Sequence, residues 1–145
     1  MIVLDTNVVS ELMRPSVDPV VSRWLVSLGE VPIATSSITV MEIAYGLARL
    51  PNGSRRAELE SRFEGLVELG EGLTVLDLDA SAASLAGQLR ARRDALGQPS
   101  SQADMMIAGI CVRSSAVLAT RNVQDFWHVG LDLVDPFQRV EPPSA

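Results

Sequence analysis

The stretch Met1-Ile-Val-Leu-Asp-Thr-Asn7 decides the fold, because it is a short apolar segment that ends in a carboxylate. Its first residues, Ile2 to Leu4, are typical of a strand buried on both faces of a parallel sheet. Asp5 follows directly, and burial of an unpaired carboxylate is costly. All twelve basic residues of the chain are arginines and there is one histidine, so Asp5 needs an arginine, a backbone donor or a cation.

Two further acids stand inside apolar segments in the same way. Glu42 lies in Ile38-Thr-Val-Met-Glu-Ile43, and Asp104 lies in Ala103-Asp-Met-Met-Ile-Ala108. The acids are far apart along the chain, so only the fold brings them together. A shared divalent cation is the simplest way to balance the three charges.

Apolar strand-like runs alternate with helical periodicity along the chain. The expected strands span residues 2–4, 31–35, 73–78, 116–119 and 131–134. The expected helices span residues 6–13, 36–50, 54–69, 79–96 and 102–113, with another that opens at Asp18-Pro19 and runs to Gly29.

This alternation predicts a three-layer α/β/α sandwich with a mostly parallel central sheet. We expect one domain over residues 1–137 and a short, disordered tail over residues 138–145. No apolar run approaches the ~20 residues that span a bilayer, which predicts a protein without a membrane segment. The start of the chain reads straight into a strand without an export signal, so we expect a cytoplasmic protein.

In parallel α/β sheets, ligands bind beyond the carboxyl ends of the strands. Asp5 ends the first strand, Glu42 is expected in the first turn of the helix after the second, and Asp104 opens the helix before a later strand. That later strand runs into Thr120-Arg-Asn122, with Asp125 three residues further on. We therefore expect these side chains to lie together at one edge of the sheet.

Each acid also has a purely structural interpretation. Glu42 stands three residues after Thr39, and Asp104 three residues after Ser101, which is the spacing of a helix-capping box. Asp125 is either a turn residue or a fourth acid of the site.

The net charge of −6 opposes a nucleic-acid partner at first sight, since such proteins usually carry a basic surface. Arginines cluster, however, at residues 55–56 and 90–93, and arginine suits bidentate phosphate contacts. Solvated helix faces explain the same clusters. Cys111, the single cysteine, is expected in the core, and His128 in packing or at the surface rather than as a general base.

Four segments together resemble the motifs of the PIN-domain nucleases, and more narrowly the VapC-like toxins of VapBC toxin–antitoxin systems. These segments are Asp5-Thr-Asn-Val8 with Ser10-Glu11, Ile38 to Ile43 with Gly46, Ala103-Asp104 with Ile107-Ala108, and Thr120-Arg-Asn122 with Asp125-Phe126. The resemblance runs from residue 1 to about residue 137.

The resemblance implies a ribonuclease whose metal-binding acids are Asp5, Glu42 and Asp104. It further implies that Thr120 orients these acids or the substrate, and the residues beside them are candidates for substrate or supporting contacts, namely Thr6, Asn7, Thr120, Arg121 and Asn122. Relatives place a fourth acid either at the position of Asn122 or at that of Asp125. We favour Asp125 as the fourth catalytic acid.

Oxygen-only ligands suit Mg²⁺ or Mn²⁺ rather than zinc, so the expected reaction is hydrolysis of an RNA phosphodiester by a metal-activated water. Arg121 is the best candidate to hold the scissile phosphate, with Arg14 behind it. A phosphoaspartyl enzyme is a rival, but such families rely on a lysine. A non-catalytic PIN-like binding module and a DNA-directed nuclease remain alternatives.

The resemblance also implies protein partners. Such toxins usually form homodimers and bind a small antitoxin, which gives a heterotetramer or a larger assembly. The antitoxin lays a helix along the toxin and directs an arginine or another group at the metal site. Apolar residues of the first half, which offer a surface for that helix or simply face the sheet, are Trp24, Tyr45, Leu47 and Leu50.

Overall fold

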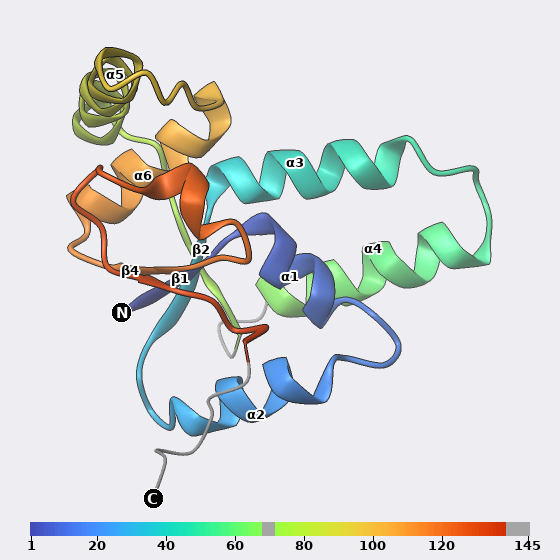
Figure 1. Cartoon of the computed structure of the whole chain (residues 1–145). Coiled ribbons are helices and arrows are strands. Elements are labelled where there is room, and N and C mark those ends of the chain that lie inside the picture. Colours follow the sequence, from blue (N-terminus) through green and yellow to red (C-terminus); the bar gives the residue numbers. More distant parts are fainter. Residues whose placement is uncertain (68–71, 139–145) are drawn as a thin grey trace, which may run out of the picture.

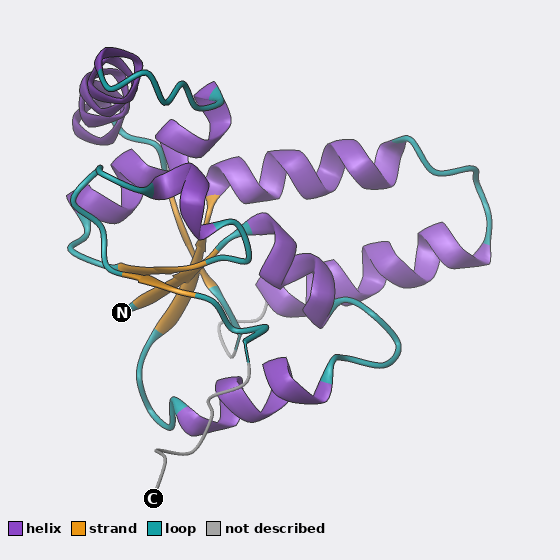
Figure 2. Ribbon diagram, viewed as in Figure 1, coloured by secondary structure: helices purple, strands orange, loops and turns teal. Residues whose placement is uncertain are grey.

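A parallel sheet with helices on both faces forms the body of the computed structural model, which describes residues 1–67 and 72–138 (Figures 1 and 2). Its strands lie in the order β3-β2-β1-β4-β5, and each neighbouring pair is parallel. The predicted α/β fold is confirmed. The strands are β1 (Ile2–Leu4), β2 (Ile33–Ser36), β3 (Thr74–Leu76), β4 (Val117–Ala119) and β5 (Leu133–Val134).

All of the expected helices form. Where the structure describes a helix end, that end lies within two residues of the expected position. None of the described helices combines the length and the apolar character that crossing a membrane requires. The helices are α1 (Thr6–Leu12), α2 (Pro19–Ser27), α3 (Ser37–Ala48), α4 (Ser54–Val67), α5 (Ala80–Ala95) and α6 (Gln102–Arg113).

The strands are shorter than the sequence suggested. The expected strands 31–35, 73–78, 116–119 and 131–134 each lose one or more residues at an end. The central strand β1 explains this, because it has only three residues. A neighbouring strand continues only where its backbone can form hydrogen bonds to the adjacent strand. Ile2 pairs with Ile33 and Val117, and Val3 pairs with Ala34 and Leu118.

Successive residues of each strand point to opposite faces of the sheet, which divides the core in two. Val3 and Leu118 belong to a cluster beneath α5 and α6, whereas Leu4 and Ala119 belong to a second cluster with α1, α3 and α4. Cys111 lies in the first cluster, as expected, and burial raises the pKa of its thiol to about 12. The thiol is therefore inert packing.

Helix ends follow the local signals of the sequence. The Asp18 carboxylate caps α2 by accepting the Val20 N–H at 2.9 Å, and Pro19 occupies the first turn. Gly97 ends α5 with a positive φ of 70°. The Gln98 N–H donates to the Arg93 carbonyl and the Gly97 N–H to the Asp94 carbonyl, which is the Schellman arrangement that a glycine permits.

One element was not expected. A short 3-10 helix, η1 (Val123–Phe126), follows β4 and carries Asp125. Phe126 anchors η1 in the core, where its side chain is 1% exposed. Of the predicted disordered tail over residues 138–145, all but Gln138 lies outside the described residues, as do positions 68 and 69 of the helix expected at 54–69.

Helices α5 and α6 approach each other closely at Gly109 of α6. A Cβ atom at this position would lie 2.4 Å from the Ala82 carbonyl oxygen and 2.9 Å from the Ala86 nitrogen, both in the backbone of α5. A methyl group there forces the two helices apart, since no flexible side chain is available to move. This contact also fixes α6, which carries Asp104, against the rest of that layer.

We therefore expect Gly109→Ala to lower the free energy of unfolding by roughly 2–3 kcal/mol through overpacking. Gly87→Ala on α5 is the matched control, because a Cβ atom at Gly87 meets nothing within 4 Å. There the same change removes backbone freedom from a helix and stabilises it by about 0.5–1 kcal/mol. Thermal unfolding of both variants measures this difference, and equal effects would contradict the close approach.

Candidate functional site

Asp5 joins the end of β1 to the start of α1. Its backbone N–H donates to the Ala119 carbonyl at 2.9 Å, which continues the ladder between β1 and β4. Its carboxylate caps α1 by accepting the Thr6 N–H at 2.8 Å, and it also accepts the Thr120 hydroxyl at 2.7 Å. Asp5 is 5% exposed, so these neutral donors orient a buried carboxylate.

Glu42 lies in the second turn of α3, not in the first turn as expected. The N-cap of α3 is Ser36, whose hydroxyl accepts the Thr39 N–H at 3.0 Å, so the interpretation of Thr39 and Glu42 as a capping box is wrong. The Glu42 carboxylate instead accepts the Thr6 hydroxyl at 2.7 Å. This bond ties the helix after β1 to the helix after β2.

Thr39, which was expected only as a helix cap, is part of this network. Its side chain is completely buried, and its hydroxyl lies 3.1 Å from the Thr6 hydroxyl and accepts the Ser36 hydroxyl at 3.3 Å. A threonine one helical turn before Glu42, on the same face of α3, is the signal that points to this role. The hydroxyls of Thr6 and Thr39 thus hold Glu42 in place.

Asp104 is the third residue of α6, and Ser101 is the N-cap, as its spacing suggested. The Ser101 hydroxyl accepts the Asp104 N–H at 3.0 Å, whereas the hydrogen bonds of the described residues include none from the Ser101 N–H to the Asp104 carboxylate. Capping therefore involves the backbone of Asp104 and leaves its half-buried carboxylate available. The cap does not explain why this residue is acidic.

The pKa values of two acids reflect the crowding of negative charge. The pKa of Asp104 is raised to about 6, chiefly by burial; the neighbouring Ser101 hydroxyl lowers it, and the charges of Asp5, Asp125 and Glu42 contribute to the rise. Burial likewise raises the pKa of Asp5 above its ordinary value, helped by Glu42 and Asp125 and opposed by the hydrogen bonds from its threonine donors. The charges of Asp5, Glu42 and Asp125 therefore all act on Asp104.

Residues 122 and 125 differ in their relation to these acids. Asp125 is exposed on η1, and its charge raises the pKa of both Asp5 and Asp104. Asn122 donates its backbone N–H to the Thr120 hydroxyl at 3.0 Å, and its side chain makes no capping bond to η1. The charge of Asp125 therefore acts on both Asp5 and Asp104.

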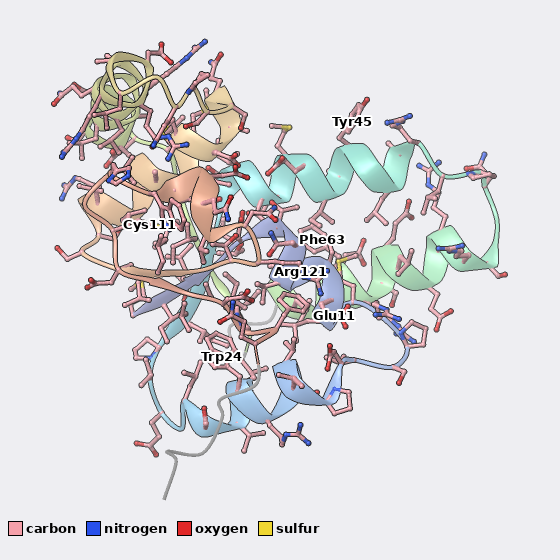
Figure 3. All side chains as sticks on the ribbon, viewed as in Figure 1. Glu11, Trp24, Tyr45, Phe63, Cys111 and Arg121 are labelled. Carbon is pink, nitrogen blue, oxygen red and sulfur yellow. The ribbon has the colours of Figure 1, made fainter. Side chains whose placement is uncertain are left out.

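Asn7 and Arg121 connect α1 to the end of β4. The Asn7 side-chain carbonyl accepts the Arg121 backbone N–H at 3.1 Å, while its amide lies 3.4 Å from both the Asp5 carboxylate and the Thr120 hydroxyl. The Arg121 guanidinium lies 3.6 Å above the centre of the Phe137 ring, beside α1 (Figure 3). This stacking was not predicted from the amino-acid pattern.

Within residues 1–67 and 72–138, no three histidine, cysteine or acidic side chains already lie close enough together to hold a metal ion. Thr6 links two of the acids, because its backbone N–H donates to Asp5 and its hydroxyl donates to Glu42. The only atoms that the four acidic side chains offer to a metal ion are carboxylate oxygens. Binding of a divalent cation would draw the carboxylates inward, because it removes the repulsion that separates them.

The arginines expected near phosphate occupy several environments. Arg14 is paired with the buried carboxylate of Glu11 at 3.1 Å, and Arg56 is paired with Glu60 at 2.6 Å. Arg93 is 5% exposed, so an interpretation of its cluster as a phosphate-binding surface is wrong for this residue. His128 lies at the surface beside Trp127, as expected.

A groove of about 400 Å³ runs from Glu42 between α1, α3 and α4. Of the apolar residues expected on a partner surface, Tyr45 points outward from α3 and is 62% exposed, whereas Leu47 is buried in the core (Figure 3). Trp24 and Leu50 are half-buried against the second core cluster. The groove is lined by Thr6, Ser10, Met13, Arg14, Glu42, Ile43, Gly46, Leu47, Arg55 and Leu59.

Comparison with known proteins gives consistent matches over nearly the whole chain. The family model of the PIN domain matches residues 2–130. The VapC ribonuclease Y4jK of Sinorhizobium fredii is 36% identical over 138 residues, which cover 95% of this chain and 99% of that protein. The toxin FitB of Neisseria gonorrhoeae is 34% identical over 94% of this chain and 99% of that protein.

Solved structures agree with the sequence matches. The crystal structure of FitAcB from Neisseria gonorrhoeae superposes with a TM-score of 0.81 at 32% identity, covering 96% of this chain and all of that one. The structural neighbours thus include FitAB and VapBC toxin–antitoxin complexes. The chain belongs to the PIN-domain family, in the branch of the VapC-like toxins.

Proposed function

We propose that this protein is the metal-dependent ribonuclease toxin of a toxin–antitoxin pair and that it acts on RNA in the cytoplasm. The observation that carries the proposal is the convergence of acids at one edge of the sheet: Thr6 joins Asp5 to Glu42, and Thr120 at the end of β4 donates to Asp5. The raised pKa of Asp104, to which Asp5, Glu42 and Asp125 contribute, supports a place for all four acids in one site. The printed names of the relatives, a VapC ribonuclease and a toxin, support the same activity.

The residues fit Mg²⁺, for which Mn²⁺ would substitute. The metal-ligating atoms are all carboxylate oxygens, which Mg²⁺ prefers. The ion pairs of the described chain involve none of the four acids. Asp5, Glu42 and Asp104 would hold the ion, with Asp125 as the fourth acid. When bound, such a cation supplies an activated water and neutralises charge on the phosphate.

The chain's own residues orient these acids without neutralising them. The Thr120 hydroxyl occupies one oxygen of Asp5, and the Thr6 hydroxyl occupies one oxygen of Glu42. Each threonine donates a neutral hydrogen bond, so the negative charge remains available to a cation. Asn7 fixes the backbone of Arg121 at the same edge.

Arg121 is the residue that we propose to hold the scissile phosphate. Its backbone is anchored to Asn7, and Phe137 supports one face of its guanidinium. The N–H groups along the edge of the guanidinium can therefore donate to a phosphate oxygen. Arg14, the second candidate, is already paired with Glu11 and is better placed in the groove beside Glu42.

We further propose that the antitoxin seats a helix in the groove between α1, α3 and α4. The groove has an apolar floor that includes Ile43 and Leu47, and it ends at the Glu42 carboxylate, which attracts a basic side chain of the partner. With a homodimeric toxin this gives a heterotetramer or a larger complex. The mass of the purified complex in solution tests the assembly.

The proposal predicts cleavage of RNA by antitoxin-free protein in Mg²⁺ or Mn²⁺ and none in EDTA. A panel of RNA and single-stranded DNA oligonucleotides distinguishes the two substrates. Asp104→Asn should reduce the rate by ~100-fold or more, since even an indirect partner of a metal ligand contributes 10–100-fold. Cleavage that survives EDTA, or that is confined to DNA, would overturn the proposal.

The raised pKa of Asp104 predicts how the metal-free protein responds to pH. The folded state binds this proton more tightly than the unfolded state, so stability falls as pH rises from about 4 through 6. In EDTA, the thermal midpoint should be higher at pH 5 than at pH 7.5, and Asp104→Asn should raise it at pH 7.5. Asp132→Asn, which removes one exposed charge, controls for net charge, and an equal gain would refute a local effect.

Arg121→Ala should slow cleavage and leave Mn²⁺ affinity unchanged, because the guanidinium faces phosphate and not the cation. In the inactive Asp104→Asn background, the slope of RNA affinity against salt concentration should fall by ~0.7, the value for one phosphate contact on a single strand. Arg23→Ala, an exposed arginine of α2, serves as the control. Unchanged cleavage would remove Arg121 from the mechanism.

A further inference from the structure

Arg93 is a buried cation whose hydrogen bonds all go to backbone carbonyls. The side chain is 5% exposed, and the ion pairs found among the described residues do not include it. Its Nε donates to the Gln98 carbonyl at 2.8 Å, and its Nη1 donates to the carbonyls of Gln124 and Trp127 at 3.2 and 2.8 Å. A buried guanidinium is costly to desolvate, so these acceptors are what makes its burial tolerable.

The three acceptors belong to two segments that both lead to acids of the site. Gln98 lies in the turn that joins α5 to α6, a few residues before the Ser101 cap and Asp104. Gln124 lies in η1 directly before Asp125, and Trp127 is the C-cap of η1. One side chain of α5 thus bridges the connection before one acid and the short helix that carries another.

The short helix η1 depends on such contacts for its position. It has four residues, and a 3-10 helix of this length has too few internal hydrogen bonds to be stable alone. Phe126 attaches it to the core on one side, and Arg93 attaches it to α5 through the carbonyls of Gln124 and of the C-cap residue Trp127. Asp125 stands between these two attachments, so its direction depends on both of them.

We propose that Arg93 is a positioning residue for the fourth acid: it fixes η1 against α5 and the following turn, so that Asp125 faces the other carboxylates. This inference rests on the proposed function, because it assigns Arg93 a role in the affinity of that site for its cation. A guanidinium is required for this role, since a lysine ammonium cannot span three acceptors with a fixed geometry.

The test compares Arg93→Met with Arg92→Met in the full-length chain. Arg92 is the neighbouring residue of α5 and is exposed, so the same chemical change there leaves the bridge intact. Arg93→Lys, which keeps the charge and is less disruptive, provides a second variant if Arg93→Met folds poorly. The readouts are amide hydrogen exchange of η1 and the dissociation constant for Mn²⁺ from calorimetry.

We expect Arg93→Met and Arg93→Lys to speed exchange in residues 122–128 and to weaken Mn²⁺ binding about tenfold or more, as loss of a supporting contact does in metal sites. Arg92→Met should change neither readout. In an Asp125→Asn background, Arg93→Met should weaken Mn²⁺ binding by less than about twofold, because two residues that act through one group are not additive.

Faster exchange of η1 with unchanged Mn²⁺ affinity would make Arg93 a structural anchor only and overturn its role at the site. An equal loss of affinity in the wild-type and Asp125→Asn backgrounds would also overturn it, since the effect would then not pass through Asp125. A wild-type protein that binds no Mn²⁺ would refute the proposed function and this role together. In that case the exchange measurement would still report separately on whether Arg93 anchors η1.

Discussion

The cost of gathering carboxylates at the end of buried strands governs the design of this protein. Burial, and to a smaller extent repulsion from neighbouring acids, raises the pKa of Asp5 and Asp104, and the chain has no lysine to offset their charge. Neutral donors, the hydroxyls of Thr6 and Thr120, orient the acids but leave the net charge uncompensated. A fold with such a cluster is stable only because the rest of the sheet and its helices compensate for the local cost.

Topology explains why these acids meet at all. β1 is central in the order β3-β2-β1-β4-β5, so the segments that follow β1, β2 and β4 emerge side by side at one edge. The chain passes from β1 outward to β2 and β3 and then returns to β4 on the other side of β1. In doubly wound sheets the crevice where the direction reverses is the usual ligand site. Asp5 and Thr120, which follow β1 and β4, stand on either side of it.

Local signals in the sequence were sufficient wherever short-range chemistry decides the outcome. Asp18-Pro19 and Ser101 marked helix starts correctly, because capping depends on a few neighbouring residues. The run Ile2 to Leu4 followed by Asp5 similarly identified the central strand and the edge where the site lies.

Features set by contacts between distant segments were not readable from the sequence. The hydrogen bond from Thr6 to Glu42 joins residues 36 positions apart, whereas the error over the turn that Glu42 occupies was local, because Thr39 offered as good a capping pattern as Ser36. The 3-10 helix around Asp125 has no periodicity of its own, and it is held by Phe126 and by Arg93, some thirty residues earlier in the chain. A charge cluster on a helix likewise does not reveal that one of its arginines is buried.

The arginines around the site share one property that links stability to function. Arg93 is bound by carbonyls, Arg121 lies on the Phe137 ring, and Arg14 is paired with Glu11, an acid outside the cluster. Each cation is thus retained by a group other than the four acids. An arginine paired with Asp5 or Asp104 would stabilise the metal-free fold, but it would also compete with the divalent cation for the same oxygens. Keeping these cations on carbonyls, an aromatic ring and an outside carboxylate preserves the negative charge that the proposed chemistry requires.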